Sequence, residues 1–274
     1  MITKEDYEER DCPLCMRNDG VTPISVSRMI ERLDALLSTD DTAGARRHLA
    51  YWLEEARVGR DVRGEIAVLN EQMGLYRKCG MREEAYAAAL AAERAVLTAG
   101  LSDTVSAATV LLNAATVCAA FGAPEEAVTR YRRAMIIYEK TLSPEDGRVA
   151  ALKNNLAAAL VELGEYEEAL ALYKEALKLG KSESARYLDA AVTLLNIADL
   201  LYRRDGAEQS ADAVGALCAE ADALLSDARV VRDGNYAFVA DKCAAAFRFH
   251  GFFLLADKYA RLSRALYGKD GADG

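Results

Sequence analysis

The sequence lacks long apolar runs, an excess of basic charge and more than a few prolines, and each shortage excludes a class of protein. No stretch of about 18 apolar residues appears, so we expect no membrane-spanning segment. The charged N-terminus, residues 1–11, has no apolar core of the kind that secretory signals carry. With 34 basic and 43 acidic side chains, a formal charge of −9, the chain lacks the basic face that nucleic acids require. Only four prolines interrupt 274 residues, which leaves room for long helices.

Histidine and paired cysteine are scarce as well. His48 and His250 are the only histidines, and neither has a serine, cysteine or carboxylate constellation in sequence, so we expect no enzymatic activity and no cofactor. Cys12 and Cys15 form a CxxC pair, but a structural zinc site needs four ligands, so they are only weak metal candidates. A homodimer that pools two such pairs is an alternative. The six scattered cysteines form no small disulfide framework, which indicates a cytoplasmic protein.

What the chain does contain is helical periodicity, clearest over residues 149–179. Leu152, Leu156 and Leu160 fall on one stripe of a helix that Gly164 ends, and a second amphipathic stripe follows. A pair of such helices cannot bury its apolar face alone, so the pair should recur along the chain.

The pair recurs at a fixed interval of 42 residues. The interval is marked by glycines that turn the chain and by alanines small enough for close packing: Gly80, Gly122, Gly164 and Gly206, then Ala85, Ala127, Ala169 and Ala211, with Ala43 one step earlier. A fixed period of this length is typical of stacked helical solenoids. The sequence therefore predicts an all-α repeat protein.

The repeat resembles a known family. The residues that carry the resemblance are Leu156, Ala157, Gly164, Tyr166, Ala169, Tyr173 and Ala176. They resemble the tetratricopeptide-repeat (TPR) pattern, and the longer interval, with residues 69–76, resembles its kinesin-light-chain variety. The resemblance implies a right-handed α-α superhelix, a TPR solenoid of about six helical pairs, and it does not by itself imply a function.

We expect a single TPR solenoid over residues 23–267. It would lie between a flexible N-terminal segment, residues 1–22, which carries the CxxC pair, and a disordered tail, residues 268–274. The expected repeats are 24–58, 61–99, 102–142, 147–180, 184–226 and 233–267. The first and last match the family pattern more weakly, as terminal repeats usually do.

Asparagines recur in the first helix of successive pairs. They are Asn70, Asn113, Asn154, Asn155 and Asn196. Asparagine is a mediocre helix former, so its recurrence indicates a role. In the proteins that the sequence resembles, first helices line a concave groove and their asparagines hydrogen-bond an extended peptide. The alternative is a ladder of asparagines that joins neighbouring repeats.

Basic residues occupy the slots seven and eight residues after these asparagines near both ends of the array. They are Arg77, Lys78, Arg203, Arg204 and, by equivalence, Arg248. If they face the groove, the ligand should carry acidic or carboxylate groups. The alternative is that they are solvated helix ends that interact with the C-terminal helix dipoles.

The sequence thus predicts a non-catalytic scaffold that binds a protein or an extended peptide, with no nucleic acid, membrane or cofactor involved. The alternative is a regulatory module of a bacterial signalling system that senses a peptide or a small molecule.

Overall fold

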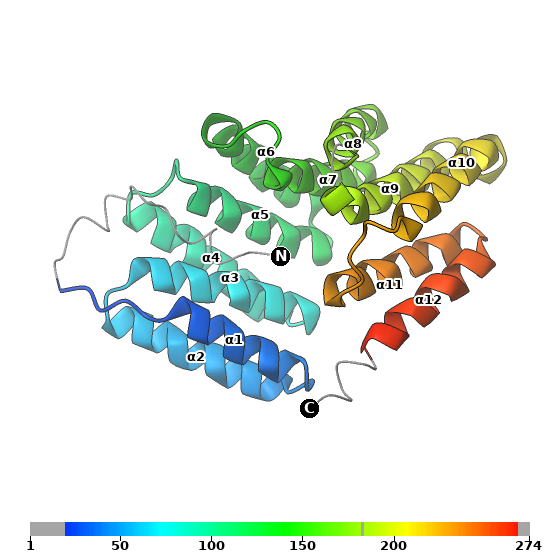
Figure 1. Cartoon of the computed structure of the whole chain (residues 1–274). Coiled ribbons are helices and arrows are strands. Elements are labelled where there is room, and N and C mark those ends of the chain that lie inside the picture. Colours follow the sequence, from blue (N-terminus) through cyan, green and yellow to red (C-terminus); the bar gives the residue numbers. More distant parts are fainter. Residues whose placement is uncertain (1–19, 182–183, 268–274) are drawn as a thin grey trace. The chain divides into compact units, whose positions relative to one another are not determined.

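The computed structural model describes residues 20–181 and 184–267. Within these ranges the chain forms twelve α-helices and no strand, which confirms the predicted all-α fold of about six helical pairs (Figure 1). Cys12, Cys15 and the predicted tail, residues 268–274, lie outside the described residues. None of the described helices is long and apolar enough to cross a membrane.

Two units divide the chain, Met1–Thr141 and Leu142–Gly274. In unit 1 three helical pairs follow one another, each made of a first and a second helix: α1 (Val26–Leu37) with α2 (Thr42–Val58), α3 (Val62–Lys78) with α4 (Arg82–Thr98), and α5 (Val105–Ala120) with α6 (Pro124–Thr141). The first helices α3 and α5 contact each other, and α4 packs against α5. Each pair thus buries its apolar face against the next.

Unit 2 repeats this arrangement with three further pairs. They are α7 (Gly147–Glu162) with α8 (Tyr166–Gly180), α9 (Tyr187–Asp205) with α10 (Ala207–Ser226), and α11 (Gly234–Phe249) with α12 (Phe253–Tyr267). A short 3-10 turn, Ser184–Arg186, leads into α9. The central first helix α9 contacts both α7 and α11, so the three first helices of unit 2 lie next to one another.

Side-chain caps and glycine turns explain where the helices begin and end. Asp41, Asp61 and Asp233 each accept a hydrogen bond from a backbone N–H in the first turn of α2, α3 and α11, at 2.8, 3.0 and 3.0 Å. These bonds satisfy donors that the start of a helix leaves unpaired. Gly122 and Gly164 adopt φ values of 77° and 78°, a left-handed conformation that favours glycine, as the repeat pattern predicted.

The alanine series is partly confirmed. Ala85, Ala127 and Ala169 are fully buried where helices pack closely. Ala43 and Ala211 are exposed instead, so their assignment to the packing series was wrong.

Helix boundaries explain the shift at Ala211. The connection between α9 and α10 is the single residue Gly206, whereas three residues separate α7 from α8. The shorter connection moves the buried position one residue earlier, to Ser210. In the first repeat the buried alanine is Ala45, and Asp40, at φ 55°, takes the left-handed position in place of a glycine.

Candidate peptide-binding surface

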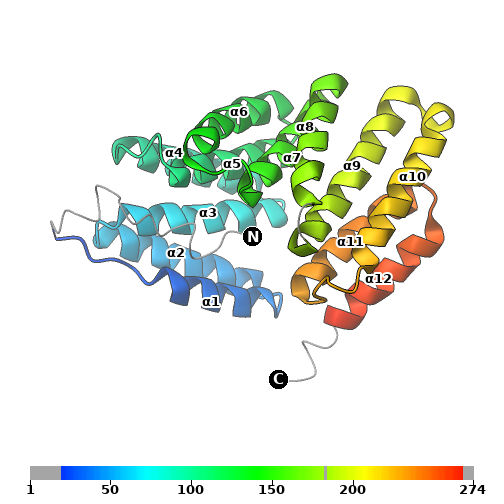
Figure 2. The ribbon, with the colours of Figure 1, turned by 45° about the horizontal axis from the view of Figure 1, so that its top comes forward.

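An exposed stripe runs along each first helix of unit 2, whose helices are labelled in Figure 2. Its members are exposed or half-buried and fall at i, i+4, i+7 and i+11 on each helix. We name these twelve residues the first-helix face of unit 2: Ala151, Asn155, Ala158 and Glu162 on α7; Val192, Asn196, Asp199 and Arg203 on α9; Phe238, Lys242, Ala245 and Phe249 on α11.

The buried neighbours of the stripe show that these positions are equivalent. Leu152 on α7 and Thr193 on α9 each follow the first stripe residue, and both are buried. Val239 takes the same place on α11 and is also buried. The alignment pairs Asn196 with Asn155, although the two lie at different distances from their turn glycines. The one-residue connection at Gly206 accounts for that difference.

Two contacts join the stripes across neighbouring helices. Arg203 Nη1 on α9 donates to Glu162 Oε1 on α7 at 2.8 Å. Tyr202 on α9 and Phe249 on α11 make an edge-to-face ring contact with centroids 5.2 Å apart. The stripes therefore form one surface at the C-terminal ends of the three helices.

Asn155 and Asn196 lie on this surface at matching positions. Both are half-buried, and neither makes a hydrogen bond within the part of the chain that the structure describes. An asparagine side chain offers two donors and one carbonyl acceptor, the set that an extended peptide backbone can pair with. These two side-chain amides are thus free to form further hydrogen bonds.

The other asparagines join neighbouring repeats. Asn113 Nδ2 on α5 donates to Asn70 Oδ1 on α3 at 2.9 Å, and Asn70 is 3% exposed. Asn154 Nδ2 on α7 donates to Thr193 Oγ1 on α9 at 2.8 Å. In these three residues the side-chain amide forms a hydrogen bond to the neighbouring first helix. This is the arrangement expected if the asparagines join neighbouring repeats.

The basic candidates of unit 2 all have carboxylate partners. Arg203 also pairs with Asp199 at 2.9 Å, Arg204 pairs with Asp205 and Glu167 at 2.7 and 3.2 Å, and Arg248 pairs with Asp257 at 2.6 Å. Burial alone would lower the pKa of Arg203, but Asp199 and Glu162 outweigh it and raise that pKa. Because their charges are matched, these arginines add little net positive charge to the surface.

The basic candidates of unit 1 differ. Arg77 is half-buried and Lys78 is exposed at the end of α3, and neither has an ion pair among the described residues. They remain candidate ligand contacts on unit 1, and their position next to the C-terminus of α3 also suits the helix-dipole alternative.

An aromatic cluster on this surface escaped the sequence analysis. Tyr202, Phe249 and His250 form three ring contacts, with centroid distances of 5.0 to 5.8 Å. Phe249 is 61% exposed and Phe238, on the same stripe, 59%. Burial lowers the pKa of His250, and Asp199 only partly offsets this, which favours the neutral imidazole. The cluster adds exposed aromatic surface at the C-terminal ends of α9 and α11.

No group of three or more His, Cys, Asp or Glu side chains that could hold a metal ion occurs among the described residues. Cys12 and Cys15, the weak metal candidates, lie outside those residues, so their role stays a prediction.

The stacked pairs of helices place this chain in the class of helical-repeat proteins. The tetratricopeptide-repeat family model matches residues 106–182 and 148–216. Residues 106–216 thus match tetratricopeptide repeats, and the fold of the chain is similar to that of kinesin-light-chain repeats. Comparison with curated proteins gives no sequence match.

Several solved structures share the fold at low sequence identity. Kinesin-light-chain TPR-like repeats of Podosopora anserina are 18% identical, with a TM-score of 0.52 over 74% of this chain and 94% of theirs. The apo form of RapI is 13% identical, with a TM-score of 0.61 over 90% of this chain and 84% of its own. NprR in complex with its cognate peptide NprX is 14% identical, with a TM-score of 0.58 over 88% and 68%.

Proposed function

We propose that the protein is a non-catalytic scaffold that binds an extended segment of another protein on the first-helix face of unit 2. The observation that carries the proposal is the pair of half-buried amides, Asn155 and Asn196, which have no hydrogen-bond partner in the described chain. A similarly folded protein, NprR, has been solved with a bound peptide, which supports the same mode of use here.

The energetics favour a backbone ligand at this face. Each amide can exchange hydrogen bonds with a peptide group, and each such bond contributes about 1 kcal/mol net. The helices fix both amides in place, so little entropy is lost when they bind. Phe238 and Phe249 add exposed apolar surface on α11, which would accept an apolar side chain of the ligand.

Acidic groups on the ligand are a further part of the proposal. Lys242 lies on the stripe of α11 between the two phenylalanines, and it is exposed. A carboxylate of the ligand could pair with Lys242 without displacing an existing ion pair, because no salt bridge of Lys242 occurs among the described residues. Nucleic acid and membranes are not proposed as partners, and a cytoplasmic location is part of the same proposal.

Site-specific photo-cross-linking tests the binding face. A benzophenone amino acid replaces Ala158, which is exposed on the first-helix face, or Ala213, which is exposed on the second helix α10 as a matched control. In a native lysate we expect a cross-linked partner from position 158 and none from position 213. Adding Asn155→Ala and Asn196→Ala should reduce the yield about tenfold while far-UV circular dichroism stays unchanged. Equal yields at both positions, or a yield that ignores the asparagines, would contradict the proposal.

A peptide-sensing regulatory module is the second candidate, favoured by the likeness to NprR in complex with its cognate peptide. A sensor should change conformation when the bound segment is added, whereas a static scaffold should not. Small-angle scattering with a synthetic copy of the cross-linked segment separates the two: an altered curve at saturation supports the sensor, and a superimposable one supports the scaffold.

A further inference from the structure

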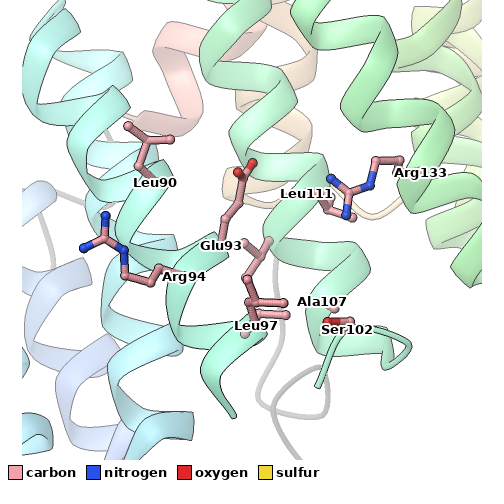
Figure 3. A pocket seen from close by; sticks show the side chains of 10 residues that line it. Leu90, Glu93, Arg94, Leu97, Ser102, Ala107, Leu111 and Arg133 are labelled. Carbon is pink, nitrogen blue, oxygen red and sulfur yellow. The ribbon is translucent and has the colours of Figure 1, made fainter. Parts of the chain in front are cut away.

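In unit 1, a pocket of about 370 Å³ opens between the helices α4, α5 and α6 (Figure 3). Its floor is apolar and comes from Val110 and Leu111 of α5, together with Val96 of α4, all of which are buried. Its rim carries Leu90 and Leu97, which are 56% and 70% exposed. The volume lies within the range of natural ligand pockets. None of these residues belongs to the first-helix face of unit 2.

The apolar surface extends beyond the pocket itself. Leu90 and Leu97 are seven residues apart on α4, so they lie two helical turns, about 10 Å, from one another. Ile136, 53% exposed, lies three residues after Arg133 on α6, outside the pocket lining. A two-turn apolar rim is longer than one small ligand requires and matches the spacing of anchors on an amphipathic helix.

The mouth of the pocket carries positive charge that is not neutralised. Glu93 lines the pocket, but Arg130 Nε donates to its Oε1 at 2.8 Å, so its charge is matched. Arg133 on α6 is exposed and has no carboxylate partner in the described chain. Figure 3 shows its side chain extending inward across the mouth, beside Leu111. Arg94 of α4 also lines the pocket, and its guanidinium extends to the side away from Arg133 in the same view.

We propose that this pocket docks an acidic amphipathic helix of a partner protein. One apolar side chain of that helix fills the pocket above Val110 and Leu111, and a second packs against Leu90 or Leu97 on the rim. A carboxylate on the same helix pairs with Arg133. The net charge of −9 opposes an anionic partner at long range, so the preference rests on the local charge of the unpaired Arg133 beside the exposed leucines, which complements an anionic helix.

Two synthetic helical peptides test the proposal. Both carry leucines at i, i+4 and i+7. Glutamate fills the remaining positions in one peptide, and lysine fills them in its twin. With the full chain, fluorescence anisotropy should show the acidic peptide binding at least about tenfold more tightly than the basic twin. Leu97→Gln should weaken binding about tenfold, because Leu97 is an exposed anchor whose replacement leaves the fold intact.

Charge reversal provides the matched control. Arg133→Glu should invert the preference between the two peptides, whereas Arg47→Glu, at an exposed position of α2 outside the pocket lining, changes net charge equally but should alter affinity less than about threefold. Equal binding of the two peptides, or equal losses in the two variants, would overturn the proposal. The proposal would also be overturned if the acidic peptide lost affinity only in the Asn155→Ala, Asn196→Ala double variant and not in the pocket variants. That result would make the first-helix face the binding site of the peptide. Failure of photo-cross-linking at Ala158 bears only on that first-helix face.

Discussion

The hydrogen bond between Asn113 and Asn70 predicts a measurable energetic coupling between two repeats. The acceptor, Asn70 Oδ1, belongs to a side chain that is 3% exposed, and the donor lies 2.9 Å away on the next first helix. Asn113→Ala leaves this buried carbonyl without that donor, which should cost about 1–3 kcal/mol of unfolding free energy. Once Asn70 is already alanine, Asn113→Ala removes no such bond. The double-mutant cycle should therefore give a coupling of about 1 kcal/mol.

Urea unfolding followed by tryptophan fluorescence measures this coupling. Trp52 is the only tryptophan, and it lies on α2 in the same unit as both asparagines, so it reports the unfolding of unit 1. The control pair combines Asn113→Ala with Lys78→Ala, an exposed residue without an ion pair in the described chain, and should be additive within about 0.5 kcal/mol. A coupling below about 0.3 kcal/mol for Asn70 and Asn113, or a harmless Asn113→Ala, would refute the ladder role of these residues.

Two further predictions concern a turn and a set of thiols. Gly164→Ala should destabilise the protein by about 1–2 kcal/mol in urea unfolding followed by circular dichroism, because φ is 78° there, whereas Gly147→Ala, which meets open space at ordinary φ, should be neutral within about 0.5 kcal/mol. Equal effects would mean that backbone strain does not decide the cost. Iodoacetamide should label exposed Cys79 and spare Cys243 in peptide-resolved mass spectrometry, since Cys243 is buried and burial raises its pKa to about 12. Equal labelling would show that α11 opens readily in the native state.

The periodic residues predicted the fold because each reports a local requirement. Gly122 and Gly164 adopt the left-handed conformation that a turn between two helices needs, and Ala127 and Ala169 are buried where those helices pack. Each of these requirements depends on a few neighbouring residues, so the fixed interval between the glycines and between the alanines is enough to predict the stacked helical pairs. The division into two units at Thr141 leaves no comparable mark in the series.

The pairing of the basic residues could not be predicted in the same way. Arg203 and Arg204 meet Glu162 and Glu167, which are about 40 residues earlier in the chain and lie on or next to the preceding helical pair. A charge pattern read along one helix does not show which carboxylate lies opposite on another. The partners depend on how the helices stack, and the stacking follows from side chains that the repeat interval does not specify.

The aromatic residues of α11 did leave a signal. Phe238 and Phe249 are eleven residues apart, which places them on one face of a helix. The sequence analysis followed asparagines and basic residues, so the phenylalanines at the ends of this stripe were missed. Phe249 lies two residues before Gly251, as Glu162 lies two residues before Gly164, so the turn glycines already bring these two stripes into register.

Asn154 and Asn155 show why the sequence left two roles open for its asparagines. Successive residues of a helix are rotated by about 100°, so two adjacent amides face different surroundings. Asn154 turns toward α9 and donates to Thr193, while Asn155 lies on the first-helix face without a hydrogen-bond partner in the described chain. A single asparagine therefore takes either the ladder role or the ligand role, whereas one repeat can hold one asparagine of each kind. Which role an asparagine takes depends on its register in its own helix, and the distance to the turn glycine does not report that register, because the connection at Gly206 has one residue and the connection at Gly164 has three.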